Sequence, residues 1–302
     1  MNPIINEIKK LKTEKDAVIL AHYYVDGEVQ EIADHVGDSY YLSKMAAELP
    51  NRVIVFCGVA FMGESAKILS PDKIVLMPAP DADCPMAHMA NVEKVEQIRK
   101  THEDLAVVCY INSTAEIKAV SDVTVTSSNA LKIIRRLPQK NIYFIPDANL
   151  GRYLAKSVPE KNFIFNDGYC HVHKDLSPEA ILKAKELYRD AKVLAHPECT
   201  PEALALADYI GSTSGIIDYA TASGENEFII CTEQGVLYEL QKKNPQKSFY
   251  LVEQEQICPD MKKITLENIA ACLQNMEGEA EVEESLRRKA AAALEKMLEY
   301  AV

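Results

Sequence analysis

The chain has 302 residues, of which 48% are hydrophobic and 26% are charged, and its formal net charge is −12. This composition is typical of a globular protein of two or three domains, and the acidic excess argues against binding to nucleic acids or anionic membranes. Residues 1–10 lack the apolar run of a secretion signal, and the longest apolar stretch, residues 53–62, is too short to span a bilayer. We expect a cytoplasmic protein that acts on small molecules.

The first part of the chain predicts a small α/β unit. Residues 18–21, 53–56 and 73–76 are rich in Val, Ile and Leu, as strands are. Residues 28–35 repeat apolar side chains at the three- and four-residue spacing of a helix. Polar residues stand after these elements, in the order His22, Tyr24, Asp38, Ser39 and Cys84.

The same order of elements returns twice further along the chain. The second unit is expected to have strands at residues 106–109, 142–145 and 162–165 and a helix at residues 114–121. The third is expected to have strands at residues 192–195, 228–230 and 248–252 and a helix at residues 201–209. Equivalent polar residues lie 85 to 88 positions apart: His22, Tyr110 and His196; Asp34, Asp122 and Asp208; Ser39, Ser127 and Ser212; and Cys84, Cys170 and Cys258.

This triple repeat predicts the architecture. Apolar strands that alternate with amphipathic helices indicate parallel sheets with helices on both faces. We therefore predict three similar α/β/α sandwich domains, at residues 1–84, 85–170 and 171–260, followed by a helical segment at residues 261–302 with no assigned chemistry. Because ligands bind beyond the carboxyl ends of parallel strands, packing around a pseudo-three-fold axis would place the repeated polar residues around one central active site.

The three repeated cysteines are candidate metal ligands. Eight cysteines in a long cytosolic chain without a CxxC pair are more naturally thiols, metal ligands or nucleophiles than a disulfide framework. Three thiolates suit either a zinc ion with an open position or an iron–sulfur cluster with one iron free of protein ligands. A single cysteine also fits a small buried side chain, which is the interpretation for those without threefold partners: Cys57, Cys109, Cys199, Cys231 and Cys272.

The other repeated polar residues have two interpretations. Ser, Thr and Asp before a helix are ordinary N-caps, but a helix N-terminus with a hydroxyl also binds phosphate or carboxylate. His, Tyr and Glu at strand ends satisfy local hydrogen bonds or transfer protons in a closed site. A zinc-dependent hydrolase or lyase and a non-catalytic repeat scaffold therefore stay open beside an iron–sulfur enzyme.

Several strings along residues 18–269 resemble the quinolinate synthase family. They include Ile19-Leu20-Ala21-His22-Tyr23-Tyr24, Gly37-Asp38-Ser39, Tyr110-Ile111-Asn112, Thr126-Ser127-Ser128-Asn129-Ala130, His196-Pro197-Glu198-Cys199 and Cys258-Pro259-Asp260-Met261. The resemblance implies a cytoplasmic enzyme of NAD biosynthesis that condenses iminosuccinate, supplied by L-aspartate oxidase, with dihydroxyacetone phosphate to give quinolinate, phosphate and water. It also implies a [4Fe-4S] cluster whose open iron acts as a Lewis acid.

The same resemblance assigns roles to residues of this chain. It implies that the three repeated cysteines, Cys84, Cys170 and Cys258, bind the cluster. Tyr24 and Glu198 would be the proton-transfer pair, with His22 and His196 as orienting or auxiliary groups. The substrates would be bound by residues from all three units: His22, Ser39, Tyr110, Asn112, Ser127, His196, Glu198, Ser212 and Thr213.

Overall fold

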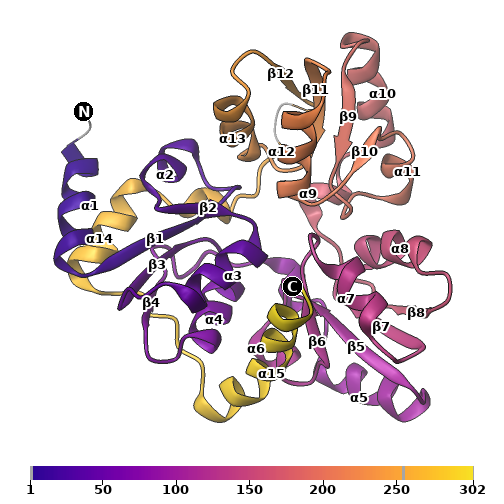
Figure 1. Cartoon of the computed structure of the whole chain (residues 1–302), viewed down its shortest axis with the longest axis horizontal. Coiled ribbons are helices and arrows are strands. Elements are labelled where there is room, and N and C mark those ends of the chain that lie inside the picture. The colour runs from indigo at the N-terminus through magenta and orange to yellow at the C-terminus, as the bar shows by residue number, and fades with distance from the viewer. Residues whose placement is uncertain (1–2, 254–255, 302) are drawn as a thin grey trace.

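Three separate four-stranded sheets make up the body of the protein (Figure 1). The computed structural model describes residues 3–253 and 256–301. The strand orders are β2-β1-β3-β4, β6-β5-β7-β8 and β10-β9-β11-β12, and neighbouring strands run parallel in each sheet. In Figure 1 the sheets occupy three lobes of a triangular molecule, each with helices beside it. The α/β class and the three similar domains are confirmed, while the pseudo-three-fold axis stays a prediction.

The first unit carries the first sheet. Its elements are α1 (Pro3–Glu14), β1 (Ala17–His22), α2 (Gly27–Ile32), β2 (His35–Gly37), α3 (Ser39–Glu48), β3 (Val53–Cys57), α4 (Ala60–Leu69), β4 (Ile74–Leu76) and the 3₁₀ turn η1 (Pro85–His88). Strands β1 and β3 are buried along their whole length, because a parallel sheet has helices on both faces. This explains why these strands are continuous apolar runs without a polar alternation.

The second and third units repeat this arrangement. The second has α5 (Val92–Thr101), β5 (Leu105–Tyr110), α6 (Ala115–Ala119), β6 (Val123–Val125), α7 (Ala130–Arg136), β7 (Asn141–Ile145), α8 (Ala148–Ser157), β8 (Asn162–Phe165) and α9 (His171–Lys174). The third has α10 (Pro178–Leu187), β9 (Lys192–Ala195), α11 (Pro201–Leu204), β10 (Tyr209–Ile210), α12 (Thr213–Ala222), β11 (Glu227–Cys231), α13 (Val236–Lys243), β12 (Ser248–Leu251) and η2 (Met261–Lys263).

The helix after the first strand of each unit is shorter than the sequence predicted. The helices expected at residues 28–35, 114–121 and 201–209 are α2, α6 and α11, so their predicted ends were wrong. Each gives way to a strand of two or three residues, β2, β6 or β10, which pairs with the first strand of its unit. Strands this short show no recognisable period in a sequence.

The repeated aspartates have a structural role in all three units. The Oδ2 atoms of Asp34, Asp122 and Asp208 accept hydrogen bonds from backbone N–H groups of the first strands, at 2.9, 2.7 and 2.8 Å. These N–H groups belong to Ile19 and to its equivalents in β5 and β9. Each aspartate therefore connects the turn before the second strand of its unit to the first strand, which lies inside the sheet. None of the three lines the cavity described below.

The last two helices, α14 (Leu266–Asn275) and α15 (Glu284–Tyr300), pack on the first two units. Helix α14 contacts α1, and α15 contacts α4, α6 and β6. Between them the chain covers the edge of β4, where Met77 N–H donates to Gly278 O and Ala280 N–H to Val75 O, both at 2.8 Å. The domain limits stay a prediction, and residues 1, 2, 254, 255 and 302 within them lie outside the described part. Nowhere in residues 3–253 and 256–301 does a helix reach the length and apolarity that a membrane crossing needs.

Candidate active site

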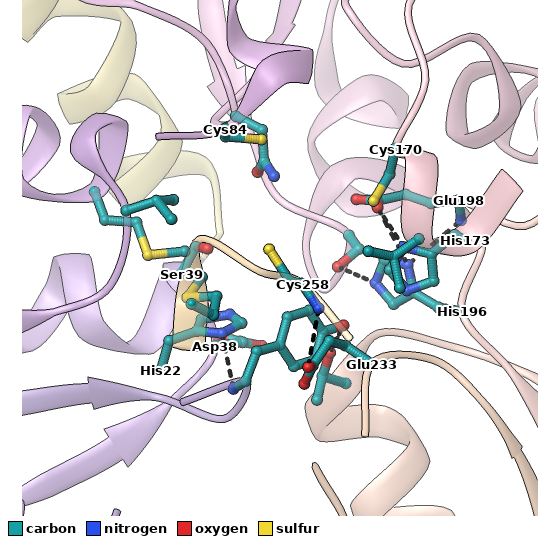
Figure 2. A pocket seen from close by; sticks show the side chains of 18 of the residues that line it. His22, Asp38, Ser39, Cys84, Cys170, His173, His196, Glu198, Glu233 and Cys258 are labelled. Atoms are coloured by element: carbon teal, nitrogen blue, oxygen red, sulfur yellow. Dashed lines mark hydrogen bonds and ion pairs between the residues drawn. The ribbon is translucent and has the colours of Figure 1, made fainter. Parts of the chain in front are cut away.

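One cavity, of about 70 Å³, is lined by residues of all three units. A buried water needs about 10–15 Å³ of such space, so the cavity is large enough for several waters or a small ligand. Figure 2 shows Cys84, Cys170 and Cys258 around a common space, with His173 and Glu198 gathered on one side of it.

Most of the site residues predicted from the sequence line this cavity. Besides the three cysteines they are His22, Tyr24, Ser39, Tyr110, Asn112, Ser127, His196, Glu198 and Thr213. Ser212 does not line it: its hydroxyl caps α12 and accepts a hydrogen bond from the Gly215 N–H at 3.1 Å. The strand-end position of these residues therefore brings them together, while their individual roles in binding and catalysis stay predictions.

The three cysteines lie in the loops that follow the last strand of each sheet. Cys84 and Cys170 come directly before η1 and α9, and Cys258 comes shortly before η2. Their side chains are partly exposed. The other five cysteines are buried, which agrees with the packing role expected for those five. Because the cavity walls exclude most water from them, the pKa of all three thiols is raised, that of Cys84 to about 12. A metal that binds such thiols displaces their protons.

Backbone and side-chain hydrogen bonds tie the three cysteine loops together. In the first loop, the N–H of Asp83 donates to Oδ1 of Asp260 in the third loop, at 3.2 Å. In the second loop, Nδ2 of Asn166 donates to the carbonyl of Met89, which follows the first loop, at 2.8 Å. The protein's own contacts therefore bring the three loops to one cavity.

Glu198 is the centre of a buried acid–base group. Its Oε1 accepts a hydrogen bond from the Tyr110 hydroxyl at 2.5 Å, and its Oε2 lies 2.9 Å from Nδ1 of His173 and 4.0 Å from Nδ1 of His196. Burial opposes the ionisation of Glu198, but His196, His173 and Tyr110 together lower its pKa to about 2. The carboxylate is therefore ionised at neutral pH and can accept a proton.

Two histidines near this carboxylate, His22 and His196, are held neutral. Burial lowers the pKa of both His22 and His196 to about 3, although the negative charge of Glu198 opposes the shift. The Nε2 atom of His196 lies 3.2 Å from the Ser127 hydroxyl, and Nδ1 of His22 accepts the N–H of Tyr24 at 3.2 Å. Neutral imidazoles can orient polar groups here without adding positive charge.

Tyr24, from the first unit, reaches two hydroxyls of the third unit. Its phenolic oxygen lies 2.8 Å from the hydroxyls of both Thr213 and Thr232. Burial, together with the nearby Glu198, raises the pKa of Tyr24 well above its usual range. Tyr24 is therefore protonated at neutral pH and can donate a proton.

Two ionisable residues of the cavity wall, His173 and Glu233, were not predicted from the sequence. Glu233 is buried, lies 3.2 Å from Nζ of Lys262, and accepts the N–H of Cys258 at 3.2 Å. His173 is not part of the threefold pattern, because the equivalent positions, three residues after the other two cysteines, are Ala and Met. The sequence feature that could have indicated His173 is its position three residues after Cys170, a candidate metal ligand.

One mixed group of donors could also hold a metal ion. The ligand atoms of Cys170, His173 and Glu198 all lie within 4.8 Å of one another. Sulfur, nitrogen and oxygen donors in this number are typical of a zinc site with an open position. The cavity therefore offers two donor sets, three cysteines or this mixed group, and they share Cys170.

The sequence is similar to known proteins along nearly its whole length. The model of the family described as "Quinolinate synthetase A protein" matches residues 6–299. A quinolinate synthase of Clostridioides difficile (strain 630) is 54% identical over 288 residues, which are 95% of each chain. Quinolinate synthases of Caldicellulosiruptor bescii and Fusobacterium nucleatum subsp. nucleatum are both 55% identical, over 97% of each chain for the first and over 98% of this chain and 99% of the relative for the second.

Proposed function

Since the chain belongs to the quinolinate synthetase A family, we propose that this enzyme condenses iminosuccinate with dihydroxyacetone phosphate in NAD biosynthesis. The products are quinolinate, phosphate and water. The observation that supports the proposal best is the convergence of three equivalent cysteines with Tyr24 and Glu198 on one cavity. Metal ligands with an acid and a base in one closed pocket suit a condensation that eliminates water.

The cysteines are proposed to hold a [4Fe-4S] cluster. The residues fit this group because Cys84, Cys170 and Cys258 supply three soft sulfur donors from three loops. No fourth cysteine is among the described residues of the cavity wall, which would leave one iron without a protein ligand. When bound, the cluster would supply Lewis-acid chemistry that polarises a hydroxyl or carboxylate.

Helix N-termini and hydroxyls are proposed to bind the anionic substrates. Ser39 and Thr213 are the first residues of α3 and α12, two helices of 10 residues each. Their N–H groups and hydroxyls therefore stand at the positive ends of helix dipoles, where carboxylates and phosphates bind. Asn112 and Ser127 would complete the pocket from the second unit. Neither Lys nor Arg occurs among the described lining residues, so these neutral donors take the place of salt bridges.

Glu198 is proposed as the base and Tyr24 as the acid. The carboxylate is ionised and the phenol is protonated at neutral pH, as their opposite pKa shifts indicate. An elimination of water needs one group of each kind, because a proton leaves carbon while another joins the departing hydroxide. His22 and His196 would orient the reacting groups as neutral imidazoles.

The chemistry of the first substrate implies a nearby source. An imine reacts readily with water, so we propose a functional coupling to L-aspartate oxidase, which would supply iminosuccinate in the cytoplasm. Substrate delivery of this kind needs neither a nucleic acid nor a membrane surface, in agreement with the acidic composition.

Anaerobic purification followed by iron, sulfide and quinolinate analysis tests the proposal. About four irons and four sulfides are expected in the parent, and they should be lost in Cys84→Ala, Cys170→Ala and Cys258→Ala. Cys231→Ala, at a buried cysteine outside the cavity wall, should keep them. Stoichiometric zinc without iron would overturn the proposal of an iron–sulfur cluster and favour a zinc site at Cys170, His173 and Glu198. A parent that contains the cluster but forms no quinolinate would overturn the reaction.

A further inference from the structure

Two buried polar side chains outside the cavity wall occupy equivalent positions of the repeat. Gln30 and Lys118 are each the fourth residue of the helix after the first strand, α2 in the first unit and α6 in the second. They lie 88 positions apart, as His22 and Tyr110 do. Gln30 is 2% exposed and Lys118 is fully buried. Because an amide and an ammonium are costly to bury, their contacts have to compensate for the lost hydration.

In the first unit, the amide of Gln30 holds the turn that carries Tyr24. Its Nε2 donates to the carbonyls of Tyr23 and Val25, both at 2.9 Å. A third acceptor, at 3.0 Å, is the carbonyl of Gly235 in the third unit. One side chain therefore fixes the turn of the proposed acid and joins this turn to a neighbouring unit.

In the second unit, the ammonium of Lys118 holds the turn that carries Tyr110 and Asn112. Its Nζ donates to the carbonyl of Ser113, which stands where Val25 stands in the first unit. The hydroxyl of Ser113 in turn donates to the carbonyl of Tyr110 at 2.9 Å. The two buried side chains therefore donate to the same position of equivalent turns.

Lys118 also joins its turn to a neighbouring unit. Helices α4 and α6 lie side by side (Figure 1), and Nζ of Lys118 is 5.5 Å from the ring centroid of Phe61, within the range of a cation–π contact. Phe61, which lines the cavity, comes four residues after the end of β3. Gly235, the partner of Gln30, likewise comes four residues after the end of β11. Both side chains therefore contact the same position of the unit beside them.

The charge of Lys118 is supported from the first unit. Burial lowers the pKa of Lys118, and the negative charge of Glu64 is among the groups that oppose the shift. Glu64 lies in α4, and its Oε2 accepts the N–H of Ala115, the first residue of α6, at 3.1 Å. The carboxylate therefore attracts the ammonium and anchors the helix that carries it.

In the third unit the equivalent turn is held from outside. The fourth residue of α11 is Leu204, which packs in an apolar cluster and has no side-chain donor. The turn after β9 is instead held by Asn149 of the second unit, whose Nδ2 donates to the carbonyl of Glu198 at 3.2 Å. Asn149 comes four residues after the end of β7, the position equivalent to Phe61. All three strand-end turns are therefore tied to another unit.

We propose that Gln30 and Lys118 are positioning residues, which keep the site residues of the first two units aimed into the cavity by holding their turns against a neighbouring unit. Neither side chain lines the cavity, so neither touches a substrate there. The inference rests on the proposed function, because it takes Tyr24 as the acid and Asn112 as a binding group. A displacement of about 1 Å in such groups can cost about 10²-fold in rate.

Two substitutions of Lys118 test the role of its donor. Lys118→Leu copies the third unit and removes the donor, whereas Lys118→Gln copies the donor of the first unit. In Lys118→Leu, kcat/KM for quinolinate formation by the anaerobic, iron-loaded enzyme should fall by about 10- to 100-fold, while Lys118→Gln should stay within about threefold of the parent. Urea denaturation and iron content are measured for each variant, so that activities are compared per folded, loaded enzyme.

Hydrogen exchange gives a second readout, which does not depend on activity. The N–H groups of Ile111 and Ser113 each donate to a backbone carbonyl, at 2.9 and 2.8 Å, so they report on the turn. In Lys118→Leu both should exchange about tenfold faster than in the parent, as expected for the loss of one hydrogen bond to a charged group, and Lys118→Gln should restore slow exchange. Gln30→Leu should speed exchange in residues 23–25 in the same way, which tests the proposal in the first unit should Lys118→Leu not fold.

Lys247→Leu is the matched control. Lys247 is also buried and donates to the carbonyls of Ala220 and Ser223, at 2.6 and 2.7 Å. Its Nζ lies 5.6 Å from the ring centroid of Phe228. None of these four residues lines the cavity, so the folded, iron-loaded variant should keep kcat/KM within about twofold of the parent, because the site residues are not displaced.

Equal activity of the Leu and Gln variants of Lys118 would show that its donor does not position the turn, and would overturn the proposal. Exchange at the parental rate in Lys118→Leu and in Gln30→Leu would overturn it as well. A parent that contains the cluster but forms no quinolinate would overturn the proposed function instead, and the exchange rates would still decide whether the two side chains hold their turns.

Discussion

Tyr110 donates a 2.5 Å hydrogen bond to Glu198, although the two residues come from different units of the repeat. This bond stabilises the ionised carboxylate and fixes its orientation toward the cavity. Tyr110→Phe removes the donor and little volume but leaves the carboxylate in place, so kcat should fall by about 10- to 100-fold, less than the roughly 10²–10⁴-fold that a whole acid–base group contributes. Quinolinate formation under anaerobic conditions measures the effect.

Tyr143→Phe serves as the control for this substitution. Tyr143 is also buried but lies in β7, where its hydroxyl makes only a long 3.4 Å contact with Asn166. Its loss should leave kcat within about twofold of the parent. If Tyr110→Phe also keeps the parental kcat, the orientation of Glu198 does not depend on this bond.

The strands and their threefold order could be predicted from the sequence because each central strand is a continuous apolar run. The short strands β2, β6 and β10 could not, because two or three residues carry no period and their formation depends on pairing with a neighbour. The repeated aspartates were visible as a pattern, but their bonds to strand N–H groups became clear only from the fold.

The site could be predicted where it repeats and not where the repeat is broken. The three cysteines and the strand-end residues keep their register, so topology alone brings them to one cavity. His173 has no polar equivalent in the other units, and the pairing of Glu233 with Lys262 depends on how two separate loops of the third unit pack. The three units therefore differ in the cavity wall at positions where the sequence does not repeat.

Lys262 forms an ion pair that holds the third cysteine loop against the first unit. Its Nζ lies 3.2 Å from buried Glu233 and donates to the carbonyl of Tyr24 at 2.7 Å. Removing one partner of a buried pair leaves the other charge uncompensated, at a typical cost of about 3–5 kcal/mol. Lys262→Met should therefore lower the free energy of unfolding by about 3 kcal/mol, measured by urea denaturation.

Lys242→Met is the control for this loss of charge. Lys242 pairs with Glu31 at 3.4 Å, and both side chains are more than half exposed, so its removal should cost less than about 1 kcal/mol. In the Lys262→Met background, Glu233→Gln should recover part of the lost stability by removing the unpaired charge. Equal small effects of the two lysine substitutions would show that Lys262 is not structurally important.

The neutral state of His22 makes folding sensitive to acid. Burial lowers the pKa of His22 from its ordinary 6.5 to about 3, so the unfolded chain takes up this proton at a higher pH than the folded protein. The stability that follows is fully present above pH 6.5 and is lost as the pH falls toward 3, by about 1.4 kcal/mol per pH unit.

His22→Asn removes this titrating group. The free energy of unfolding of the variant should therefore decline less steeply than that of the parent as the pH falls below about 6.5, with a slope smaller by about 1.4 kcal/mol per unit. Between about pH 7 and 8, where His22 is neutral in both states, the two proteins should show the same slope. Parallel curves across the whole acidic range would contradict the assignment.

Helix α15 is predicted to brace the first two units against each other, although it carries no site residue. It contacts α4 of the first unit and α6 and β6 of the second, and its Leu294 is fully buried. Leu294→Ala should lower the free energy of unfolding by about 2–5 kcal/mol, because the surroundings of a deleted core side chain relax only partly. Leu187→Ala, at a leucine that is 71% exposed on α10, should change it by less than about 0.5 kcal/mol. If both substitutions have the same small effect, α15 packs without stabilising the fold, and the contact between the first two units must rest on their own helices.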